Sequence, residues 1–468
     1  MAGVPVSSTS AARSDVSSAG ANYRGPLITV TLLFFMWGLI TCLNDILIPK
    51  MKQVFDLQHW QAMLIQTAFF GAYFIVSLIY FILSVTKGDP IMRIGYKNGI
   101  ILGLLIAAVG CVLFLPAASL ESYGFFLLAL FVLASGITLL QITANPYVSI
   151  LGPPESSSSR MNLTQALNAL GTTVAPIIGG YLIFAGANAS SGADSVRVPY
   201  VALAVMLLLI AGIIKISPLP KVGSEGTIVS DAGALKYRHL VLGIVCIFAY
   251  VGGEVSIGSS IIGFLELPNI AGYNEAQATY YLSFFWGGAM VGRFFGAVAL
   301  AQYQSAVTKY GIMAVIGLVA FGLVYTLYDP AIAMIVLGLM AFNIFAFILG
   351  ASNPSRSLGL FASITVALLA VAIFGQGSVA MWAVISIGLF NSIMFPTIFD
   401  LAIKNLGIHT SQGSSLLVMA IVGGAIIPPL QGAFADVTHN LQLSFLLPLI
   451  CYVYIAFYGF IGYKPSRS

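Results

Sequence analysis

Two carboxylates interrupt long apolar stretches of this chain. Asp45 follows Asn44 in FFMWGLITCLNDILIP (34–49), and Glu254 lies in YVGGEVSIG (250–258). A carboxylate placed in hydrocarbon costs roughly 2.5–3.5 kcal/mol on insertion scales, so a chain that keeps one usually turns it toward a water-filled path. We therefore predict that Asp45 lines the central cavity of a transporter. Because its segment ends at Pro49-Lys50, a position among lipid headgroups is the alternative.

Amide and aromatic side chains lie in the other apolar stretches, several of them on one helical face. A stripe of four polar residues runs from Asn162 to Thr172 at helical spacing, and Gln141 and Asn145 are four apart. Sugar hydroxyls need paired polar partners, and the apolar face of a sugar ring stacks on an aromatic ring. A single buried amide more often holds helices together, but a stripe of four favours a polar cavity. The predicted substrate-binding residues are Asn44, Gln141, Asn145, Asn162, Gln165, Asn168, Tyr250, Glu254, Trp286 and Asn391.

The composition is that of an integral membrane protein. The chain is 59% apolar and 7% charged, against about 25% charged in soluble domains. A lipid bilayer is therefore its expected surrounding, and a net charge of +4 indicates no nucleic-acid partner. The four Cys lie in apolar segments without metal-like spacing, and the four His lie in connecting loops. We expect no metal, no cofactor and no enzymatic activity.

The apolar runs predict an all-α fold with fourteen membrane spans of about 20 residues, the length that a bilayer requires. They cover 26–48, 61–84, 97–117, 123–149, 161–185, 199–217, 239–265, 276–301, 307–328, 331–350, 358–374, 378–402, 414–434 and 442–463. Of the 19 Lys and Arg residues, only Lys50, Lys52 and Arg197 fall in predicted outside loops. This positive-inside pattern predicts a plasma-membrane protein, of the bacterial inner-membrane type, with both termini cytoplasmic.

A repeat divides the chain into two halves. Asn145-Pro146 precedes a predicted cytoplasmic loop and a Gly-rich helix, and Phe395-Pro396 in the second half precedes another such loop and Gly-rich helix. Two related halves around a midplane site are typical of secondary transporters. Pro146 and Pro396 are predicted to shape their helices, and Arg293 in GRFFG to close the cytoplasmic end by bonding carbonyls or carboxylates. Asp400 and Lys404 are expected to form an i,i+4 pair. The predicted regions are a disordered cytoplasmic tail (1–25), an N-terminal six-helix bundle (26–217), a cytoplasmic linker (218–238), a C-terminal bundle (239–463) and a short cytoplasmic tail (464–468).

Several motifs resemble a known family of transporters. NDILIP (44–49), ANPYVSILGP (144–153), RMNLTQALNALG (160–171) and FPTIFDLAIKNLG (395–407) resemble the fucose:proton symporter and glucose/galactose permease family of the major facilitator superfamily. VGGEVSIGS (251–259) and SQGSSLLVMAIVGGAIIPPLQG (411–432) are most similar to its glucose/galactose branch. The resemblance implies two six-helix pseudo-repeats, alternating access and sugar import driven by a cation gradient, usually of protons. Because family members commonly have twelve helices, about 305–352 is interpreted as an inserted helix pair.

The resemblance also implies roles for the acidic residues. Asp45 matches the family's protonatable Asp. The fucose branch has Glu where this chain has Gln141, and Gln where it has Glu254, so we infer that the coupling carboxylate has moved to Glu254. On this hypothesis Asp45 takes a proton outside and releases it inside, while Glu254 shares the proton or binds sugar hydroxyls.

Alternatives stay open at this point. Asp45 with Asn44 could bind sodium instead of a proton, and N-acetylglucosamine, fucose, mannose or fructose could replace glucose or galactose. A drug or metabolite exporter would have a more apolar cavity. A non-transporting sugar sensor would keep the fold and bind sugar without uptake. A monomer suffices for this fold.

Overall fold

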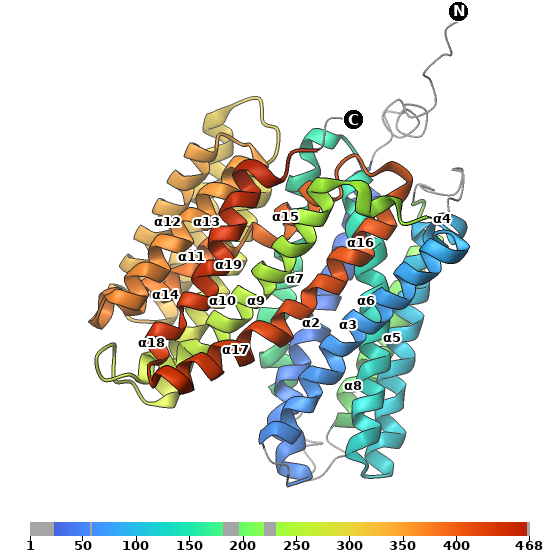
Figure 1. The fold of residues 1–468 in the computed structure, drawn as a ribbon, viewed down its shortest axis with the longest axis horizontal. Coiled ribbons are helices and arrows are strands. Elements are labelled where there is room, and N and C mark those ends of the chain that lie inside the picture. The colour runs from blue at the N-terminus through green and yellow to red at the C-terminus, as the bar shows by residue number, and fades with distance from the viewer. Residues whose placement is uncertain (1–22, 57–58, 181–195, 220–230, 466–468) are drawn as a thin grey trace, which may run out of the picture.

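Helices make up all the regular structure of the described residues, which are 23–56, 59–180, 196–219 and 231–465 of a computed structural model. In lipid every backbone N–H and C=O must be satisfied within the protein, so long apolar runs fold as helices. Residues 1–22 and 466–468 of the predicted tails and residues 220–230 of the predicted linker lie outside the described residues. The first half contains α2 (Arg24–Val54), α3 (His59–Lys87), α4 (Pro90–Ile94), α5 (Tyr96–Ser119), α6 (Tyr123–Ile150), α7 (Ser157–Gly180) and α8 (Arg197–Ile216) (Figure 1).

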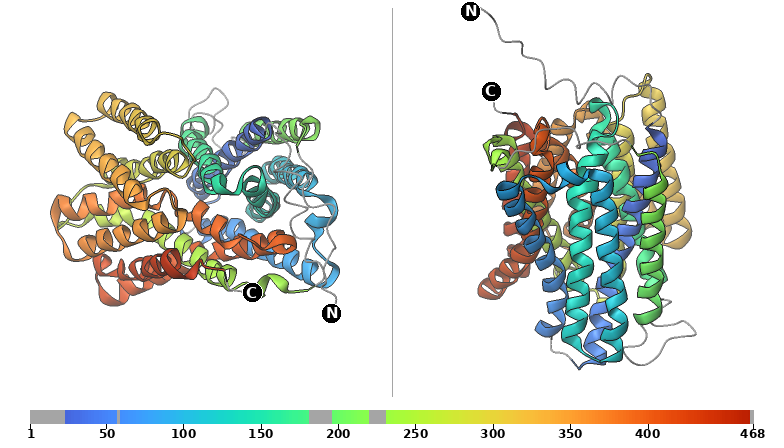
Figure 2. Two further views of the ribbon diagram at one scale, coloured as in Figure 1. Left: turned by 90° about the horizontal axis from the view of Figure 1, so that it is seen from above. Right: turned by 90° about the vertical axis from the view of Figure 1, so that its right-hand side faces the viewer.

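The second half contains more helices, and three of its membrane passes are broken. Consecutive helices α14 and α15, α16 and α17, and α18 and α19 each continue one another along the chain. Figure 2 shows the two halves side by side, the first in blue to green and the second in yellow to red. The second half comprises α9 (Arg238–Glu266), α10 (Glu275–Ala299), α11 (Ala306–Leu327), α12 (Pro330–Gly350), α13 (Pro354–Phe374), α14 (Gly377–Asn391), α15 (Met394–Ala402), α16 (Thr410–Met419), α17 (Gly423–Thr438), α18 (Leu441–Ser444) and α19 (Leu446–Phe457).

The helices have the length and composition of membrane spans. Among the described residues, 12 helices or helix pairs are long and apolar enough to cross a bilayer. Two further helices, α2 and α7, occupy the first and fifth predicted spans. The described apolar part of α2, Gly25–Ile40, is shorter than a full span. The prediction of an all-α integral membrane fold is therefore confirmed.

The same packing pattern recurs in both halves. In the first half, α2 packs on α7, α3 on α6, and α5 on α6 and α8. In the second half, α9 packs on α17, α10 on α14, and α13 on α14 and α19. This correspondence leaves α11 and α12 without counterparts in the first half. Helix α11 lies at the periphery, as the left view of Figure 2 shows, and its buried residues are only Lys309, Met313 and Gly317.

Glycines bring the main helix pairs into backbone contact. A Cβ atom added at Gly171 of α7 would lie 2.1 Å from the carbonyl oxygen of Phe35, and one at Gly38 of α2 would lie 1.9 Å from that of Asn168. On the other side, a Cβ at Gly388 of α14 would lie 2.0 Å from the carbonyl oxygen of Phe285. Small residues at such crossings allow the van der Waals packing that drives helix association in lipid. The crossings therefore set where α7 and α14 present their polar residues.

The two halves are hydrogen-bonded to each other near one end of the molecule. We call this the α4 end, because it carries α4 together with the first and last described residues (Figure 1). The Asp89 carboxylate accepts from Tyr80 of its own half at 2.5 Å and from Ser411 of the other half. Gln412 donates to Ser84 across the same junction at 3.1 Å. These contacts join the halves at the α4 end.

Asp400 forms the second junction, which corrects the predicted pair with Lys404. Its carboxylate accepts hydroxyl hydrogen bonds from three serines of the first half, Ser149 at 2.7 Å, Ser157 and Ser158. Among the ion pairs of the described residues, none joins Asp400 to Lys404, and Lys404 is exposed. The i,i+4 spacing was compatible with a pair, but the Asp400 side chain is turned across the junction instead.

Candidate functional site

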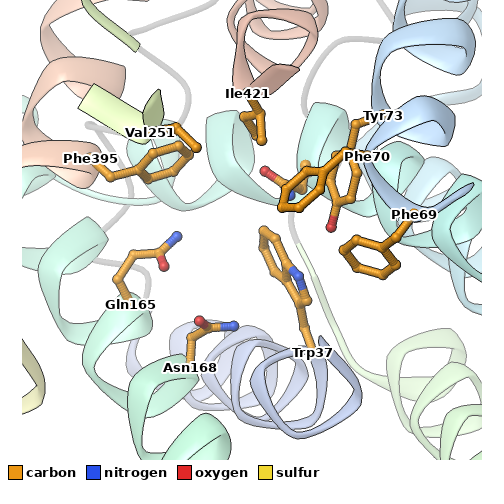
Figure 3. Close-up of a pocket in the computed structure, with 10 residues that line it drawn as sticks. Trp37, Phe69, Phe70, Tyr73, Gln165, Asn168, Val251, Phe395 and Ile421 are labelled. Atoms are coloured by element: carbon orange, nitrogen blue, oxygen red, sulfur yellow. The ribbon is translucent and has the colours of Figure 1, made fainter. Parts of the chain in front are cut away.

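A cavity of about 190 Å³ lies between the two halves. Residues of α2, α3, α6 and α7 form one wall, and residues of α9, α15 and the turn Ala420–Val422 form the other. Figure 3 shows the side chains turned toward a common space. The lining residues are Trp37, Phe69, Phe70, Tyr73, Gln141, Gln165, Asn168, Val251, Phe395 and Ile421.

Three amides supply the polar part of this cavity. Asn168 is held by its Nδ2, which donates to the Phe34 carbonyl of α2 at 3.0 Å. Gln141 Oε1 and Gln165 Nε2 are buried, and neither forms a hydrogen bond with the part of the chain that the structure describes. Buried polar atoms are nearly always hydrogen-bonded. One acceptor and one donor are thus available at the cavity for a bound molecule.

Aromatic rings form most of the remaining wall of the cavity. The Trp37 indole packs against Phe34 with ring centroids 5.2 Å apart, and the Tyr73 hydroxyl lies beside the side chains of Trp37 and Gln141. Phe69 and Phe70 stand next to Tyr73 on α3. Nothing in the sequence distinguishes these three α3 residues, because an aromatic residue in an apolar run has the same pattern whether it faces lipid or a cavity.

Glu254 lies in a network beside the cavity and is not one of its lining residues. The Tyr250 hydroxyl donates to Glu254 Oε1 at 2.6 Å, and its oxygen lies 3.3 Å from the Asn391 carbonyl. The Tyr250 ring packs near Phe395, which does line the cavity, with centroids 6.3 Å apart. The predicted residues Tyr250, Glu254 and Asn391 therefore come together one layer away from the cavity.

Other predicted residues lie away from the cavity. Asn162 uses its Nδ2 for the Ser158 carbonyl of its own helix at 2.8 Å. The side chain of Asn145 is fully buried one turn from Gln141, and its amide forms no hydrogen bond to described residues. Trp286 is 44% exposed and rests near the backbone of Gly258. Of the ten predicted binding residues, the cavity brings together Gln141, Gln165 and Asn168.

The side chains of Asn44 and Asp45 lie outside the described residues, although their backbone belongs to α2. Trp37 of the same helix lines the cavity. Eight residues of helix separate Trp37 from Asp45, which corresponds to about 12 Å along the axis. Asp45 thus lies nearer to the end of α2 opposite the α4 end, and its predicted role stays a prediction.

Arg293 and Pro396 lie at the break between α14 and α15, whereas Pro146 lies within a continuous helix. Arg293 Nε donates to the Ser392 carbonyl at 3.2 Å, which is one of the two kinds of partner that the sequence predicted. Pro396 lies in α15 just after the break from α14, and Pro146 lies buried within α6. Within the described ranges, no group of three or more His, Cys, Asp and Glu residues could hold a metal ion.

Comparison with known proteins places this geometry in a family context. The family model described as Major Facilitator Superfamily matches residues 27–357. A glucose/galactose transporter of Brucella abortus is 48% identical over 454 residues, which cover 96% of each chain. An L-fucose-proton symporter of Escherichia coli is 30% identical over 460 residues, covering 93% of this chain and 92% of that one. FucP is the fucose:proton symporter of Escherichia coli. Its crystal structure in the outward conformation superposes on this fold with a TM-score of 0.74 at 30% identity, covering 94% of this chain and 99% of FucP.

Proposed function

This chain belongs to the Major Facilitator Superfamily, and we propose that it imports a hexose of the glucose or galactose type together with a cation. The expected family resemblance is confirmed, and the chain is a multi-pass membrane transporter. The observation that carries the proposal is the cavity between the two halves, where amides and aromatic rings face one another (Figure 3). The relatives named above carry glucose, galactose or fucose in their names, which supports a sugar as the substrate.

The chemistry of the cavity suits a small uncharged ring. Gln141, Gln165 and Asn168 offer donors and acceptors to hydroxyl groups, while Trp37 and the Phe rings offer flat apolar faces. The volume of about 190 Å³ is smaller than the roughly 300–1,000 Å³ of pockets for drug-sized ligands. Among the lining residues that the structure describes there is no Lys, Arg, Asp or Glu, and this favours a neutral substrate over an acidic or basic one.

Transport would follow alternating access. The Asp89 and Asp400 junctions hold the halves together at the α4 end, which we assign to the cytoplasm from the positive-inside pattern. A protein held together on that side presents its substrate cavity to the outside. Import then requires these junctions to break while contacts form at the opposite end, so that the halves rock about the cavity.

Asp45 and Glu254 are proposed to couple the cation, with a proton as the first candidate. A proton moving down 100 mV supplies about 2.3 kcal/mol, and one pH unit adds about 1.4 kcal/mol. At one proton per sugar, these driving forces together support a sugar gradient of several hundred-fold. Sodium is the alternative ion, and the experiment below separates the two.

The test is uptake of radiolabelled glucose and galactose into proteoliposomes. An inside-alkaline pH gradient without sodium should drive accumulation that a protonophore abolishes. Accumulation that requires a sodium gradient would replace the proton by sodium. Binding of sugar without accumulation under either gradient would indicate a sensor and contradict the transport proposal. The Asp45→Asn variant should lose accumulation and keep exchange of labelled for unlabelled sugar; normal accumulation would remove Asp45 from the coupling mechanism.

A further inference from the structure

Helix α12 carries one fully buried polar side chain, Asn343. Its Nδ2 donates to the carbonyl oxygen of Leu389 in α14 at 3.3 Å. The rest of α12, PAIAMIVLGLMAFNIFAFILG, is apolar. Asn343 therefore connects this helix, which has no counterpart in the first half, to a helix that does.

The carbonyl that Asn343 reaches lies in the last turn of α14, next to a break in the helix. Pro396 has no backbone N–H, so the Ser392 carbonyl four residues earlier loses its helical partner. The chain leaves the α-helix after Asn391 and resumes it at Met394. Freed carbonyls inside a membrane must find other donors. This break is therefore a place where side chains from neighbouring helices are required.

Three helices supply those donors. Tyr250 of α9 lies 3.3 Å from the Asn391 carbonyl, and Arg293 Nε of α10 donates to the Ser392 carbonyl at 3.2 Å. The Leu389 carbonyl accepts from Asn343 and also from the Ser392 hydroxyl at 2.7 Å. Asn343 is thus one member of a set of donors that also includes Ser392 of the break itself, Tyr250 of α9 and Arg293 of α10.

Packing holds α12 in the position that this hydrogen bond requires. The ring of Phe342 meets Phe390 of α14 edge to face, with centroids 5.5 Å apart. Helix α10 approaches the same carbonyl, since a Cβ at Gly292 would lie 2.6 Å from the Leu389 carbonyl oxygen. The segment around Leu389 is therefore in contact with both α10 and α12.

We propose that Asn343 is a positioning residue for sugar transport, through which the α11–α12 pair holds the α14–α15 break in shape. The break carries Asn391, which Tyr250 approaches, and it leads directly into Phe395, which lines the cavity. This inference rests on the proposed function for its transport measurement and on the fold alone for its second measurement. An amide that only joined two helices would affect folding and leave the affinity for sugar unchanged.

The variant that tests this role is Asn343→Leu, which keeps the side-chain size and removes the donor. Thr365→Val is the matched control, because the Thr365 hydroxyl is equally buried but bonds to the Phe361 carbonyl of its own helix at 3.0 Å. If Asn343→Leu is not recovered as folded protein, Asn343→Ser replaces it. The serine hydroxyl is too short to reach Leu389.

Two measurements are made on the purified full-length protein. Amide hydrogen exchange should become at least tenfold faster in peptides covering 389–394 of the Asn343 variant, with no change in the Thr365 variant. The apparent KM for glucose should rise at least threefold in the Asn343 variant at an equal amount of folded protein.

Unchanged exchange at the break would overturn the inference whatever transport shows. Faster exchange with an unchanged KM would show that Asn343 holds the break without positioning the site, and would overturn it as well. If the wild-type protein transports no sugar, the proposed function fails and the positioning role fails with it, whereas the exchange measurement still shows whether Asn343 holds the break.

Discussion

The Tyr250 hydroxyl lies between two acceptors, Glu254 Oε1 at 2.6 Å and the Asn391 carbonyl oxygen at 3.3 Å. A tyrosine has one hydroxyl proton, so it donates to one of them at a time. A charged carboxylate is the stronger acceptor, in agreement with the shorter distance to Glu254. We expect Tyr250 to turn toward Asn391 when Glu254 takes up a proton, which would transmit protonation from α9 to the α14–α15 break.

The first prediction concerns this hydroxyl. Tyr250→Phe keeps the ring beside Phe395 and removes the donor. Hydrogen bonds to charged groups contribute roughly 1.5–3 kcal/mol, so uptake in proteoliposomes should fall about tenfold or more. Tyr454→Phe is the control, because the Tyr454 hydroxyl also donates a hydrogen bond to α9. Its acceptor is the Leu242 carbonyl oxygen, at 3.2 Å. Equal losses in both variants would show that the effect is structural.

The second prediction separates coupling from binding at Glu254. Glu254→Gln removes the titratable group and keeps the side-chain length. If the carboxyl shares the proton, accumulation should collapse while exchange continues; if it binds hydroxyls, the affinity for sugar should fall. Both are measured with labelled glucose, and Glu266→Gln at the exposed end of the same helix is the control. Wild-type affinity and accumulation would exclude both roles.

The third prediction concerns the junction at Asp400. Asp400→Asn weakens the hydrogen bonds from Ser149, Ser157 and Ser158 that join the halves, and should shift the population toward the state open at the α4 end. Spin labels placed on the two halves at that end should report longer distances. Ser158→Ala should act in the same direction. Ser156→Ala is the control, because Ser156 bonds only within the first half, to Pro153 and Arg160.

The fourth prediction tests the contact between α2 and α7. Gly171→Ala places a methyl group 2.1 Å from the Phe35 carbonyl oxygen, so the helices must separate. Overpacking typically costs about 1–3 kcal/mol, and the temperature of thermal unfolding should fall by several degrees. Gly212→Ala on α8 has no atom within 4 Å of the new methyl and should leave the unfolding temperature unchanged or slightly higher. A wild-type unfolding temperature for Gly171→Ala would contradict the described crossing.

The fifth prediction compares two amides of α7 that lie three residues apart. Gln165 lines the cavity, whereas Asn162 is bonded within its own helix. Gln165→Leu should lower the affinity for sugar about tenfold, as expected when a direct hydrogen bond to a ligand is lost. Asn162→Leu should leave affinity unchanged, even if it lowers the amount of folded protein. The opposite ranking would show that sugar binds nearer the α4 end than the cavity indicates.

Apolar runs predicted most of the helices because the requirement is local. A segment in lipid has to be about 20 residues long and must satisfy its own backbone, and both conditions can be read from consecutive residues. The same holds for Pro396, where the missing N–H predicts a distortion at a known place. Motifs such as RMNLTQALNALG (160–171) additionally identified the family. By itself, the sequence therefore determined the membrane class, the spans and the kind of transporter.

Only the tertiary structure decided which side chains meet. Asn162 and Gln165 lie on the same predicted stripe, yet the first bonds its own helix and the second faces the cavity. Phe69 and Phe70 could not be recognised, because in a bilayer a residue that faces lipid and one that faces a cavity can both be apolar. Lys404 has the correct spacing to pair with Asp400. The Asp400 carboxylate instead accepts hydrogen bonds from three serines that lie some 240 residues away in sequence. Asn343 acquires a role only when α12 is placed against the break after α14. These contacts depend on how the two halves pack, and spacing within one helix contains no information about that.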